Sequence, residues 1–492
     1  MTLPLIRTDS IFIGGSWVKG TGEPEAVINP ATEEIIGFAP VGSAQDVDAA
    51  IGAARHAFDK GPWPRMKAVE RAAVLSDFID RLEARRADIV RLIQIEAGAV
   101  STVIPIQYDF GIMLSRDAIR NGQADPHTHL ASGVATGWDG SKSFVGGTVR
   151  REPVGVISAI TPYNYPFLLN LIKIVPALMM GNTVVLKPSP FTPFAALLVA
   201  EVAAQCAFPE GALSIVTGGK EVGELMTTDP RVDLITFTGS DAVGAAIAAQ
   251  AAPTLKRLHL ELGGKSAHIV RADADLHAAA ADGMSYLWHS AQGCAAPTRH
   301  LVHNSVRARY VEILADAHRA LKIGNPEDPN ATFGPLIRES QRAKTEHYVA
   351  EGLREGGTLV TGGKRPTGFD KGFFFEPTLF DNVDNKSVLA QQEVFGPVGC
   401  VVGFDTDEQA VDMANDSAFG LAGNIWSGDL VAAHEMACAI RTGRVAINGG
   451  GSVEGSPITP FGGFKRSGLG REWGTEGLYA FTEIKAIHFR AP

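Results

Sequence analysis

The chain of 492 residues is poor in cysteine, in basic clusters and in long apolar runs. Its four cysteines lie far apart, without the spacing of metal ligands and without the density of disulfide-rich secreted domains. This pattern predicts no metal site and favours a reducing, cytoplasmic environment. The net charge of −10 argues against a nucleic-acid partner, because binding phosphates requires clustered lysine and arginine. The cysteines are Cys206, Cys294, Cys400 and Cys438.

Membrane-spanning and secretory segments are not expected either. The most apolar run, residues 167–180, contains Lys173 and Pro176 and is shorter than the roughly 20 residues that a spanning helix needs. The first residues carry Arg7 and Asp9 and no long apolar stretch, unlike a secretory signal. With 45% hydrophobic and 20% charged residues, the chain has the composition of a globular protein without a membrane partner.

What the sequence does contain is a regular alternation of apolar strands and helical segments. Strands are predicted over residues 154–160, 183–186, 213–217 and 234–237, each followed by a loop and a helix. Such alternation predicts a parallel, doubly wound α/β sheet. A second α/β unit is expected from residue 267 onward, with a strand over residues 267–270 and a helix through about Ser290. Ligands of these sheets bind at the carboxyl ends of the strands. The loops there carry Asn164, Lys187, Gly218 and Ser240.

A thiol and a carboxylate are the leading candidates for catalysis. Cys294 lies in a run of small and kinking residues that would leave its sulfur accessible, and a thiolate is a potent nucleophile. Glu261 ends an alternating stretch and precedes Gly263 and Gly264, a suitable position for a general base in a cleft. Taken alone, a buried structural thiol and an ordinary strand-end glutamate would be the safer interpretation.

Other polar residues at strand ends carry weaker signals. Residues 239–244 open a helix after a strand but lack the full G-x-G-x-x-G pattern of dinucleotide sites. Lys187 could reach ribose or phosphate oxygens, Asn164 could donate to an oxyanion, and Glu393 could bind ribose hydroxyls. Each could equally be a cap, a turn residue or a surface residue.

His289 lies five positions before Cys294 and raises a Cys/His hydrolase as a rival. A histidine in a mostly apolar helical stretch more often packs than catalyses. No nucleophile elbow or other hydrolase signature accompanies it, so this hypothesis is the weaker one.

Seven ordered motifs together resemble the aldehyde dehydrogenase superfamily, and the resemblance covers nearly the whole chain. The motifs are residues 161–166 (TPYNYP), 187–189 (KPS), 237–240 (FTGS), 261–266 (ELGGKS), 292–294 (QGC) with Arg299, 393–397 (EVFGP) and 460–468 (PFGGFKRSG).

The resemblance implies NAD(P)-dependent oxidation of an aldehyde to a carboxylic acid. Cys294 would attack the aldehyde carbon, giving a thiohemiacetal whose oxyanion the Asn164 amide and the Cys294 backbone N–H hold. Hydride transfer would then leave a thioester, which water activated by Glu261 would hydrolyse. Lys173 matches a supporting lysine of the family. Relatives that transfer the acyl group to coenzyme A differ at the position of Glu261, so hydrolysis is expected instead.

The resemblance also implies a groove for NAD, with NADP possible. Lys187 and Glu393 would hold the two riboses, Ser240 a phosphate oxygen, and Phe395 the nicotinamide side. The other expected groove residues are Ile160, Thr161, Ser189, Gly239, Gly244 and Leu262.

One departure bears on the choice of cofactor. Pro190 stands where many NAD-preferring relatives carry a glutamate that binds the adenosine ribose, so one usual reason for excluding NADP is missing. No arginine lies nearby in the sequence to receive a 2′-phosphate, although Lys220 could do so. NAD remains the favoured cofactor.

The positions that match the substrate funnel of the family are mostly apolar. They lack an arginine suited to clamp a carboxylate, which favours aliphatic or aromatic aldehydes of medium size. Glu454 is the exception and would suit a cationic or hydroxylated aldehyde. The funnel positions are Tyr165, Leu168, Ile172, Trp288, Gly293, Ala295 and Glu454.

The expected fold is α/β with three parts. Residues 1–122 and 148–260 would form a Rossmann-like doubly wound cofactor domain, and residues 261–447 a second α/β catalytic domain that carries the cysteine loop. Residues 123–147 and 470–492 would form a small β oligomerisation arm. The tail from Leu478 to Phe489 is strand-like and polar enough to lie at the edge of a sheet. Because another subunit could cover that edge, a homodimer or homotetramer is expected. A non-catalytic family member remains the alternative from another functional class, and the intact Cys294, Glu261 and Asn164 argue against it.

Overall fold

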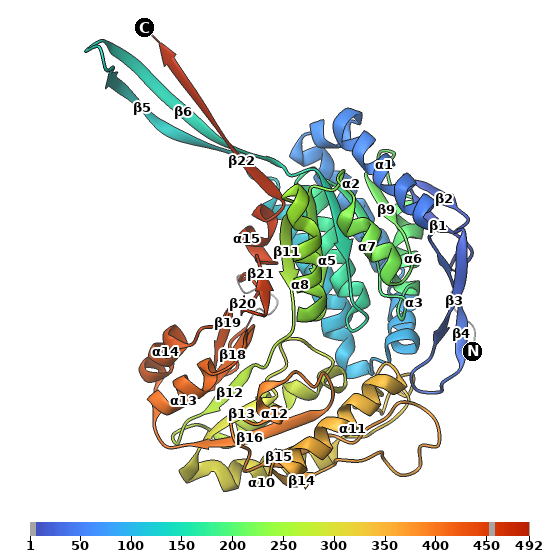
Figure 1. Cartoon of the computed structure of the whole chain (residues 1–492), viewed down its shortest axis with the longest axis vertical. Coiled ribbons are helices and arrows are strands. Elements are labelled where there is room, and N and C mark those ends of the chain that lie inside the picture. Colours follow the sequence, from blue (N-terminus) through green and yellow to red (C-terminus); the bar gives the residue numbers. More distant parts are fainter. Residues whose placement is uncertain (1–5, 452–457, 492) are drawn as a thin grey trace.

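The computed structural model describes residues 6–451 and 458–491 and contains two α/β bodies and a projecting β-sheet (Figure 1). The first body is built on an eight-stranded sheet in the order β2-β1-β9-β8-β7-β10-β11-β21. Strands β9, β8, β7, β10 and β11 are parallel, whereas β1, β2 and β21 join antiparallel at the edges. The strands are β1 (Ile11–Ile13), β2 (Ser16–Val18), β7 (Val156–Ile160), β8 (Thr183–Lys187), β9 (Leu213–Ile215), β10 (Leu234–Thr238), β11 (Arg257–Glu261) and β21 (Gly468–Leu469).

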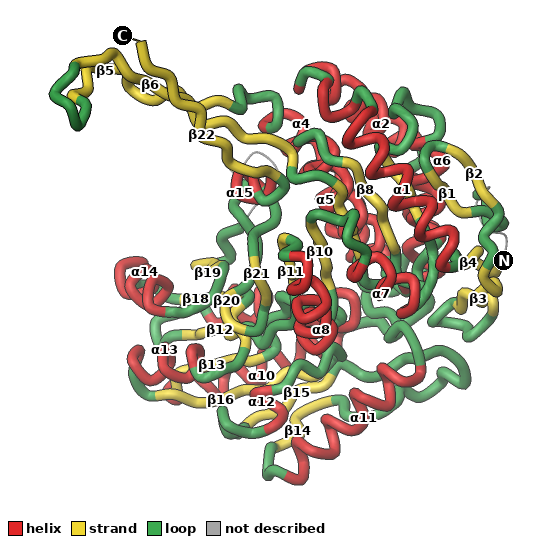
Figure 2. Tube along the Cα trace, turned by 45° about the horizontal axis from the view of Figure 1, so that its top comes forward, coloured by secondary structure: helices red, strands yellow, loops and turns green. Residues whose placement is uncertain are grey.

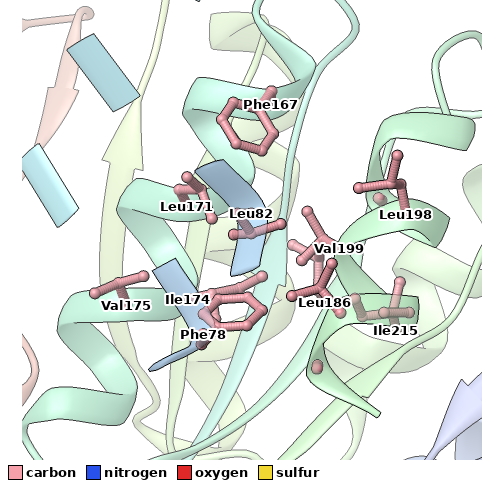
Figure 3. Close-up of a cluster of buried hydrophobic side chains, with 14 of the residues drawn as sticks. Phe78, Leu82, Phe167, Leu171, Ile174, Val175, Leu186, Leu198, Val199 and Ile215 are labelled. Atoms are coloured by element: carbon pink, nitrogen blue, oxygen red, sulfur yellow. The ribbon is translucent and has the colours of Figure 1, made fainter. Parts of the chain in front are cut away.

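Helices cover both faces of this sheet, as the predicted doubly wound class requires. One face packs on α2, α4, α5 and α6, and the other on α1, α7 and α8. Figure 3 shows part of the first core, where Phe78 and Leu82 of α2 gather with Leu171 of α5 and Leu186 of β8. The helices are α1 (Ala44–Lys60), α2 (Ala68–Ala84), α3 (Arg86–Leu92), α4 (Phe110–Asn121), α5 (Pro166–Met179), α6 (Phe194–Ala203), α7 (Lys220–Thr228) and α8 (Asp241–Ala251).

The strands of this sheet are apolar at consecutive positions because both of their faces are buried. Ile157 and Ala159 of β7 enter one core, whereas Val156 and Ile160 enter the other. The order of the parallel strands reverses between β7 and β10, since β8 and β9 lie on one side of β7 and β10 and β11 on the other. A crevice for ligands is expected at such a switch point, outside the carboxyl ends of the strands.

The second body is built on a seven-stranded sheet in the order β14-β15-β16-β13-β12-β18-β19, parallel except for β14. Its strands are β12 (Ala267–Val270), β13 (Arg299–His303), β14 (Thr358–Thr361), β15 (Thr378–Asp381), β16 (Val398–Phe404), β18 (Ala422–Trp426) and β19 (Arg444–Ile447). Its helices are α9 (Leu276–Gly283), α10 (Asn304–Ala320), α11 (Glu339–Arg354), α12 (Val388–Gln391), α13 (Asp407–Asn415) and α14 (Leu430–Ala439).

Two short pairs of strands complete the bodies. β3 (Gly22–Ile28) and β4 (Ile35–Val41) form an antiparallel hairpin beside the first sheet, and β17 (Phe419–Gly420) pairs with β20 (Phe464–Lys465).

A three-stranded antiparallel sheet projects from the bodies (Figures 1 and 2). It consists of β5 (His127–Thr136), β6 (Lys142–Pro153) and β22 (Thr482–Ala491), with β6 in the centre. The sequence predicted a strand from Leu478, but Leu478 belongs to α15 (Gly474–Tyr479), where it is buried against the first core. Strand pairing starts only at Thr482, opposite Pro153.

Within the described residues, no single helix has both the length and the apolar character needed to cross a membrane. One bent pair, residues 86–97 and 101–121, meets these criteria only when its two helices are taken together across a bend of 117°.

The second body contains a buried cluster of histidines and tyrosines. His300 Nδ1 lies 2.8 Å from the Tyr310 hydroxyl, and His318 Nε2 lies 3.1 Å from the Tyr286 hydroxyl. The ring of His268 packs at 5.2 Å from that of His300. Burial lowers the pKa of His268 to about 4 and of His318 to about 3, and lowers the pKa of His300 well below its usual value. These histidines are therefore neutral in the folded protein near neutral pH.

Replacing His318 by glutamine should make the protein less sensitive to acid. Because the folded-state pKa of His318 is about 3 and lies below the unfolded value, its contribution to stability is complete above pH ~6.5 and is lost as the pH falls. That loss is at most about 1.4 kcal/mol per pH unit. The free energy of unfolding in urea at pH 7.5 and 5.5 should therefore fall less in His318→Gln than in the wild type. Equal falls would contradict this interpretation. Other titrating groups are present in both proteins and cancel.

Candidate active site

The predicted catalytic residues meet where the loops after β7 and β11 face the cysteine loop of the second body. Asn164 follows β7, Glu261 is the last residue of β11, and Cys294 lies between α9 and β13. A Cβ atom on Gly264 would lie 2.3 Å from the Cys294 carbonyl oxygen. The segment that carries Glu261 therefore packs directly on the backbone of the cysteine loop, and only glycine fits at position 264.

The cysteine loop has a backbone conformation that the sequence did not predict. A helix through about Ser290 was expected, but α9 ends at Gly283 and a kinked 3₁₀ segment (Met284–Ala291) follows. His289, Ser290 and Ala291 have φ of 50°, 56° and 59°, in the left-handed region. This region disfavours residues with a Cβ atom, so the turn must be held by its surroundings.

Hydrogen bonds to residues 334–337 hold this turn. The Ser290 hydroxyl donates to the Gly334 carbonyl at 2.7 Å, and the Ile337 N–H donates to Gln292 Oε1 at 3.0 Å. Both side chains are buried. Tertiary contacts therefore fix the backbone that presents Cys294.

Asn164 is joined to the same loop. Its side-chain Nδ2 donates to the Gln292 backbone carbonyl at 2.7 Å, and the backbone carbonyl of Asn164 accepts from Gln107 Nε2 at 2.7 Å. One side-chain N–H of Asn164 remains for another acceptor, since an amide nitrogen carries two protons. The contact holds a neutral donor close to the backbone that leads into Cys294, the arrangement an oxyanion requires.

Glu261 is buried, and neither of its carboxylate oxygens has a hydrogen-bond partner among the described residues. Burial raises the pKa of Glu261 well above its usual value, and the charge of Glu472 raises it further. Lys173 and Arg471 oppose this shift. An unpartnered carboxylate with a raised pKa is suited to accept a proton from water or a thiol.

Lys173 forms a buried ion pair that the sequence did not predict. Its Nζ donates to Glu472 Oε1 at 2.8 Å and to the Thr236 hydroxyl at 3.0 Å. Glu472 lies 299 residues from Lys173 in the chain, and no local motif indicated this role. The predicted support for the site therefore consists of a pair of opposite charges, both of which act on Glu261.

The thiol of Cys294 is partly buried and surrounded by negative charge. Burial raises the pKa of Cys294 far above its usual value, and the carboxylates of Glu393, Glu261 and Glu472 raise it further. The sulfur is therefore protonated near neutral pH, and a base must take its proton before it can act as a nucleophile.

The predicted cofactor residues of β7 and β8 lie side by side. The Thr161 N–H donates to the Lys187 carbonyl at 3.1 Å, and Ile160 pairs with Lys187 in the sheet. Lys187 Nζ donates to the carbonyls of Pro188 and Gly218, and burial lowers its pKa to about 8. Ser189 accepts from the Phe191 N–H at 3.2 Å.

The loop after β10 brings the next predicted residues to the same edge. Ser240 caps the start of α8 by accepting from the Val243 N–H. A Cβ on Gly244 would lie 2.6 Å from the Leu262 side chain, so glycine is needed where α8 approaches this loop. Gly239 packs against the ring of Phe237. The side chains of Ser240 and Asp241 accept from the Val243 and Ala242 N–H groups, and a helix start beside bare glycine backbone is a place where a phosphate can bind.

The second body supplies Glu393 and Phe395. The Gly264 N–H donates to Glu393 Oε1 at 2.9 Å, and burial raises the pKa of Glu393 to about 7. The Phe395 ring meets Tyr163 edge-on at 6.0 Å, and Tyr163 meets Phe191 at 6.1 Å. These rings join the two bodies across the groove. A dinucleotide needs glycine backbone that it can approach closely and polar groups that bind its ribose and phosphate oxygens. The glycines after β10, the buried Lys187 and the Glu393 carboxylate fit these needs.

Arg338, which sequence reasoning missed, also reaches this groove. Its guanidinium lies 4.3 Å from the centre of the Phe191 ring, close enough for a cation–π contact. Arg338 stands at the start of α11 in the second body, whereas Phe191 follows β8 in the first. The two bodies thus approach each other at the residue next to Pro190.

The predicted substrate residues fall into two groups. Leu168 and Ile172 are buried with Leu114 in an apolar cluster that Tyr165 and Trp473 join at its edge. Nearer the thiol, a Cβ on Gly293 would lie 3.4 Å from the Tyr165 hydroxyl, and Ala295 is partly buried. Trp288 is about half exposed, and Glu454 lies outside the described residues.

The rival Cys/His arrangement is not formed. The His289 ring packs on Tyr165 at 5.6 Å, and neither of its nitrogens has a hydrogen-bond partner within the described residues. Burial lowers the pKa of His289 to about 4. His289 thus contributes to the wall of the site and does not pair with the thiol.

Comparison with known proteins relates this geometry to a family. Residues 17–487 match the model of the aldehyde dehydrogenase family. A 3-succinoylsemialdehyde-pyridine dehydrogenase from a Pseudomonas species is 38% identical over 97% of both chains. Betaine aldehyde dehydrogenase from Staphylococcus aureus, solved in complex with NAD+, is 34% identical with a TM-score of 0.93, covering 98% of this chain and 95% of that one. An aldehyde dehydrogenase from Mycobacterium tuberculosis complexed with NAD+ is 43% identical with a TM-score of 0.89, covering 97% of each chain.

Replacing Glu393 by glutamine should make Cys294 more reactive. Among the charged neighbours that raise the pKa of Cys294, Glu393 has the largest effect, and glutamine removes its charge while still accepting from Gly264. We expect alkylation by iodoacetamide at pH 7.5 to accelerate by roughly 3–10-fold at Cys294, as followed by peptide mass spectrometry. The exposed Cys438 serves as an internal reference. An unchanged ratio of the two rates would contradict the electrostatic account.

Proposed function

Since the chain belongs to the aldehyde dehydrogenase family, we propose that it oxidises an apolar aldehyde of medium size to its carboxylic acid, with NAD+ as the preferred cofactor. The observation that carries this proposal is the contact of Asn164 and of the Glu261–Gly264 segment with the backbone around Cys294. Two of the similar solved structures contain NAD+, which supports the choice of cofactor. We assign cofactor binding to residues 1–122 and 148–260 and catalysis to residues 261–447.

The reaction begins with the loss of the Cys294 proton. Because its pKa is raised, the thiol needs a base, and the unpartnered Glu261 carboxylate is the candidate. The sulfur then bonds to the aldehyde carbon, and the electron pair of the C=O bond moves to oxygen. The free amide N–H of Asn164 and the Cys294 backbone N–H stabilise the oxyanion.

The resulting thiohemiacetal must lose a hydride, and NAD+, when bound, supplies the acceptor for it. Lys187 and Glu393 would hold its riboses, and Ser240 a phosphate oxygen. Phe395 would flank the nicotinamide, while Thr161 and Leu262 would line the groove. The buried lysine, the helix start and the glycine contacts support this assignment.

Hydrolysis completes the cycle. Once Glu261 has released the thiol proton to solvent, it takes a proton from water and the water oxygen bonds to the thioester carbon. The C–S bond then breaks, the acid leaves, and the proton held by Glu261 returns to the Cys294 sulfur. The Lys173–Glu472 pair acts on Glu261 with charges of opposite sign. We infer that this pair adjusts the proton affinity of Glu261 and stabilises the structure on which Glu261 is held.

The apolar substrate class rests on the buried cluster around Leu168 and Ile172. These side chains are hydrophobic, so a substrate whose alkyl or aryl group contacts them is favoured over a charged one. A relative whose name specifies a pyridine-bearing semialdehyde supports a ring-bearing substrate. Benzaldehyde and hexanal should therefore be oxidised with a higher kcat/KM than betaine aldehyde, and the reverse order would refute the apolar assignment.

Replacing Glu261 by glutamine should trap the acyl enzyme. Without the carboxylate, the thiol can still lose its proton to solvent and react, whereas water without a base is a poor nucleophile, so deacylation slows more than acylation and steady-state turnover falls by roughly 10²–10⁴-fold. Incubation with NAD+ and benzaldehyde should leave a mass increase at Cys294 equal to the aldehyde less two hydrogen atoms, seen by intact-protein mass spectrometry. Cys294→Ala should show neither turnover nor adduct, and Cys438→Ala should behave as the wild type. Full turnover by Glu261→Gln would exclude Glu261 as the base, and no turnover of any aldehyde by the wild type would favour a non-catalytic role.

We also propose that the projecting sheet joins subunits into a homodimer or homotetramer. Residues 123–147 and 470–492 supply most of it, and its strands carry exposed apolar side chains far from either core. A monomer seldom exposes such a patch, which supports burial against a second copy. The strand register puts Val134, Phe144, Ile487 and Phe489 on one face of the sheet, which forms this patch, and puts Leu130 and Ile484 on the other face.

Replacing Ile487 by aspartate should weaken this assembly. A charge in the buried centre of an interface is costly, so the mass from size-exclusion chromatography with light scattering should fall toward that of one chain. His488→Gln, whose side chain points to the other face of the same strand, is the control. An unchanged mass for Ile487→Asp would exclude this residue from the interface.

A further inference from the structure

The adenosine end of the groove contains a carboxylate that does not come from the motif around Pro190. We propose that Glu25 of β3 binds the adenosine ribose. This inference rests on the proposed use of a dinucleotide. The Glu25 carboxylate would accept hydrogen bonds from the ribose hydroxyls and disfavour a cofactor that carries a 2′-phosphate. Position 190 holds a proline, which cannot do this, and the acid is supplied instead from 165 positions earlier in the chain.

The backbone brings Glu25 to the turn after β9. Strand β3 pairs with β4, with Glu25 opposite Ala39. Just after β4, the Gly42 N–H donates to the Thr217 carbonyl at 2.9 Å, which fixes the hairpin beside this turn. A Cβ on Gly219 would lie 3.8 Å from Glu25 Oε1, so the carboxylate lies directly against the Gly218–Gly219 backbone.

Lys187 binds the same turn. Its Nζ donates to the Gly218 carbonyl at 2.9 Å and to the Pro188 carbonyl at 3.0 Å, so one of its three protons is free for another acceptor. The charge of Glu25 favours the protonated form of this lysine and raises the pKa that burial lowers. The lysine and the carboxylate therefore form a donor and an acceptor at one place, as recognition of a ribose diol requires.

The Glu25 side chain is available for a ligand. It is exposed, no hydrogen bond or ion pair engages it among the residues that the structure describes, and its charge acts on Lys187. An ionised carboxylate only accepts hydrogen bonds, and ribose hydroxyls are suitable donors.

The same position would otherwise attract a phosphate. Gly219 caps the start of α7 without a side-chain hydrogen bond, and the N–H groups of a helix start favour anions. The carboxylate of Glu25 already lies beside this helix start, and its negative charge would repel a phosphate. Lys220, which the sequence offered as a receiver of a 2′-phosphate, is largely exposed and lies 3.5 Å from the Glu224 carboxylate.

Arg338 is another cation in this region, and its charge acts on Phe191 and Tyr163. Its guanidinium lies over the Phe191 ring and opposes the rise of the Tyr163 pKa, whereas the groups that act on Lys187 include Glu25 but not Arg338. Arg338 therefore lies beside Phe191 and Tyr163, whereas Glu25 is the charged group that acts on Lys187.

The test is to measure nucleotide binding to the full-length protein without any aldehyde. NADH and NADPH are titrated by their fluorescence, with ADP and 2′,5′-ADP as competitors that isolate the adenosine end. Wild type, Glu25→Gln and the matched control Glu23→Gln, an exposed glutamate two positions earlier on β3, are compared. Removing the carboxylate should shift the ratio of the NADPH and NADH dissociation constants toward NADPH by at least ~10-fold, because like charges in contact are strongly disfavoured.

The ratio for ADP and 2′,5′-ADP should shift in the same direction, and Glu23→Gln should leave both ratios within about twofold of the wild type. A Glu25→Gln variant whose ratios match those of the wild type would overturn the proposal, as would equal shifts in both variants. Failure of the wild type to bind either nucleotide would overturn this proposal and the proposed function together. Normal binding with the predicted shift but no aldehyde oxidation would remove only the proposed function.

Discussion

The buried ion pair between Lys173 and Glu472 is the contact on which the catalytic end of the first body depends. Nζ and Oε1 lie 2.8 Å apart, and both side chains are almost fully withdrawn from solvent. Removing either partner would leave an uncompensated charge in the interior, which typically costs about 3–5 kcal/mol. The pair joins α5 to the segment that runs from β21 through α15 into β22. One contact therefore fixes the C-terminal segment against the sheet and also sets the charges that act on Glu261.

The rest of the site follows from packing two parallel sheets so that loops from one face loops from the other. The carboxyl ends of β7, β8, β10 and β11 lie along one edge, and Asn164, Lys187, Ser240 and Glu261 all occur there. The cysteine loop of the second body can approach this edge only where side chains are missing. Gly264 meets the Cys294 carbonyl, and Gly263 lies against Glu393. These close approaches explain why the sequence has consecutive glycines directly after its candidate base.

Much of the fold could be predicted from the sequence, and the exceptions have a common cause. The parallel strands were predicted to within about two residues because strands buried on both faces carry apolar residues on both faces. The predicted helix through Ser290 was wrong, since hydrogen bonds from residues 334–337 hold the chain there in a left-handed turn. The predicted start of the last strand at Leu478 was also wrong, because that side chain is buried in α15. In both places distant contacts override the local pattern.

The sequence by itself determined the α/β class, the family, and the presence of Cys294, Glu261 and Asn164 on loops after secondary-structure elements. These features depend on side-chain type and on spacing between near neighbours, which the backbone geometry of helices and strands translates directly into position. Only the tertiary structure decided which charges surround them. Glu472 beside Lys173 and Glu25 beside Lys187 are brought together across 299 and 162 positions of the chain. Electrostatic interactions depend on distance through space and on burial, and neither is encoded in the local order of residues.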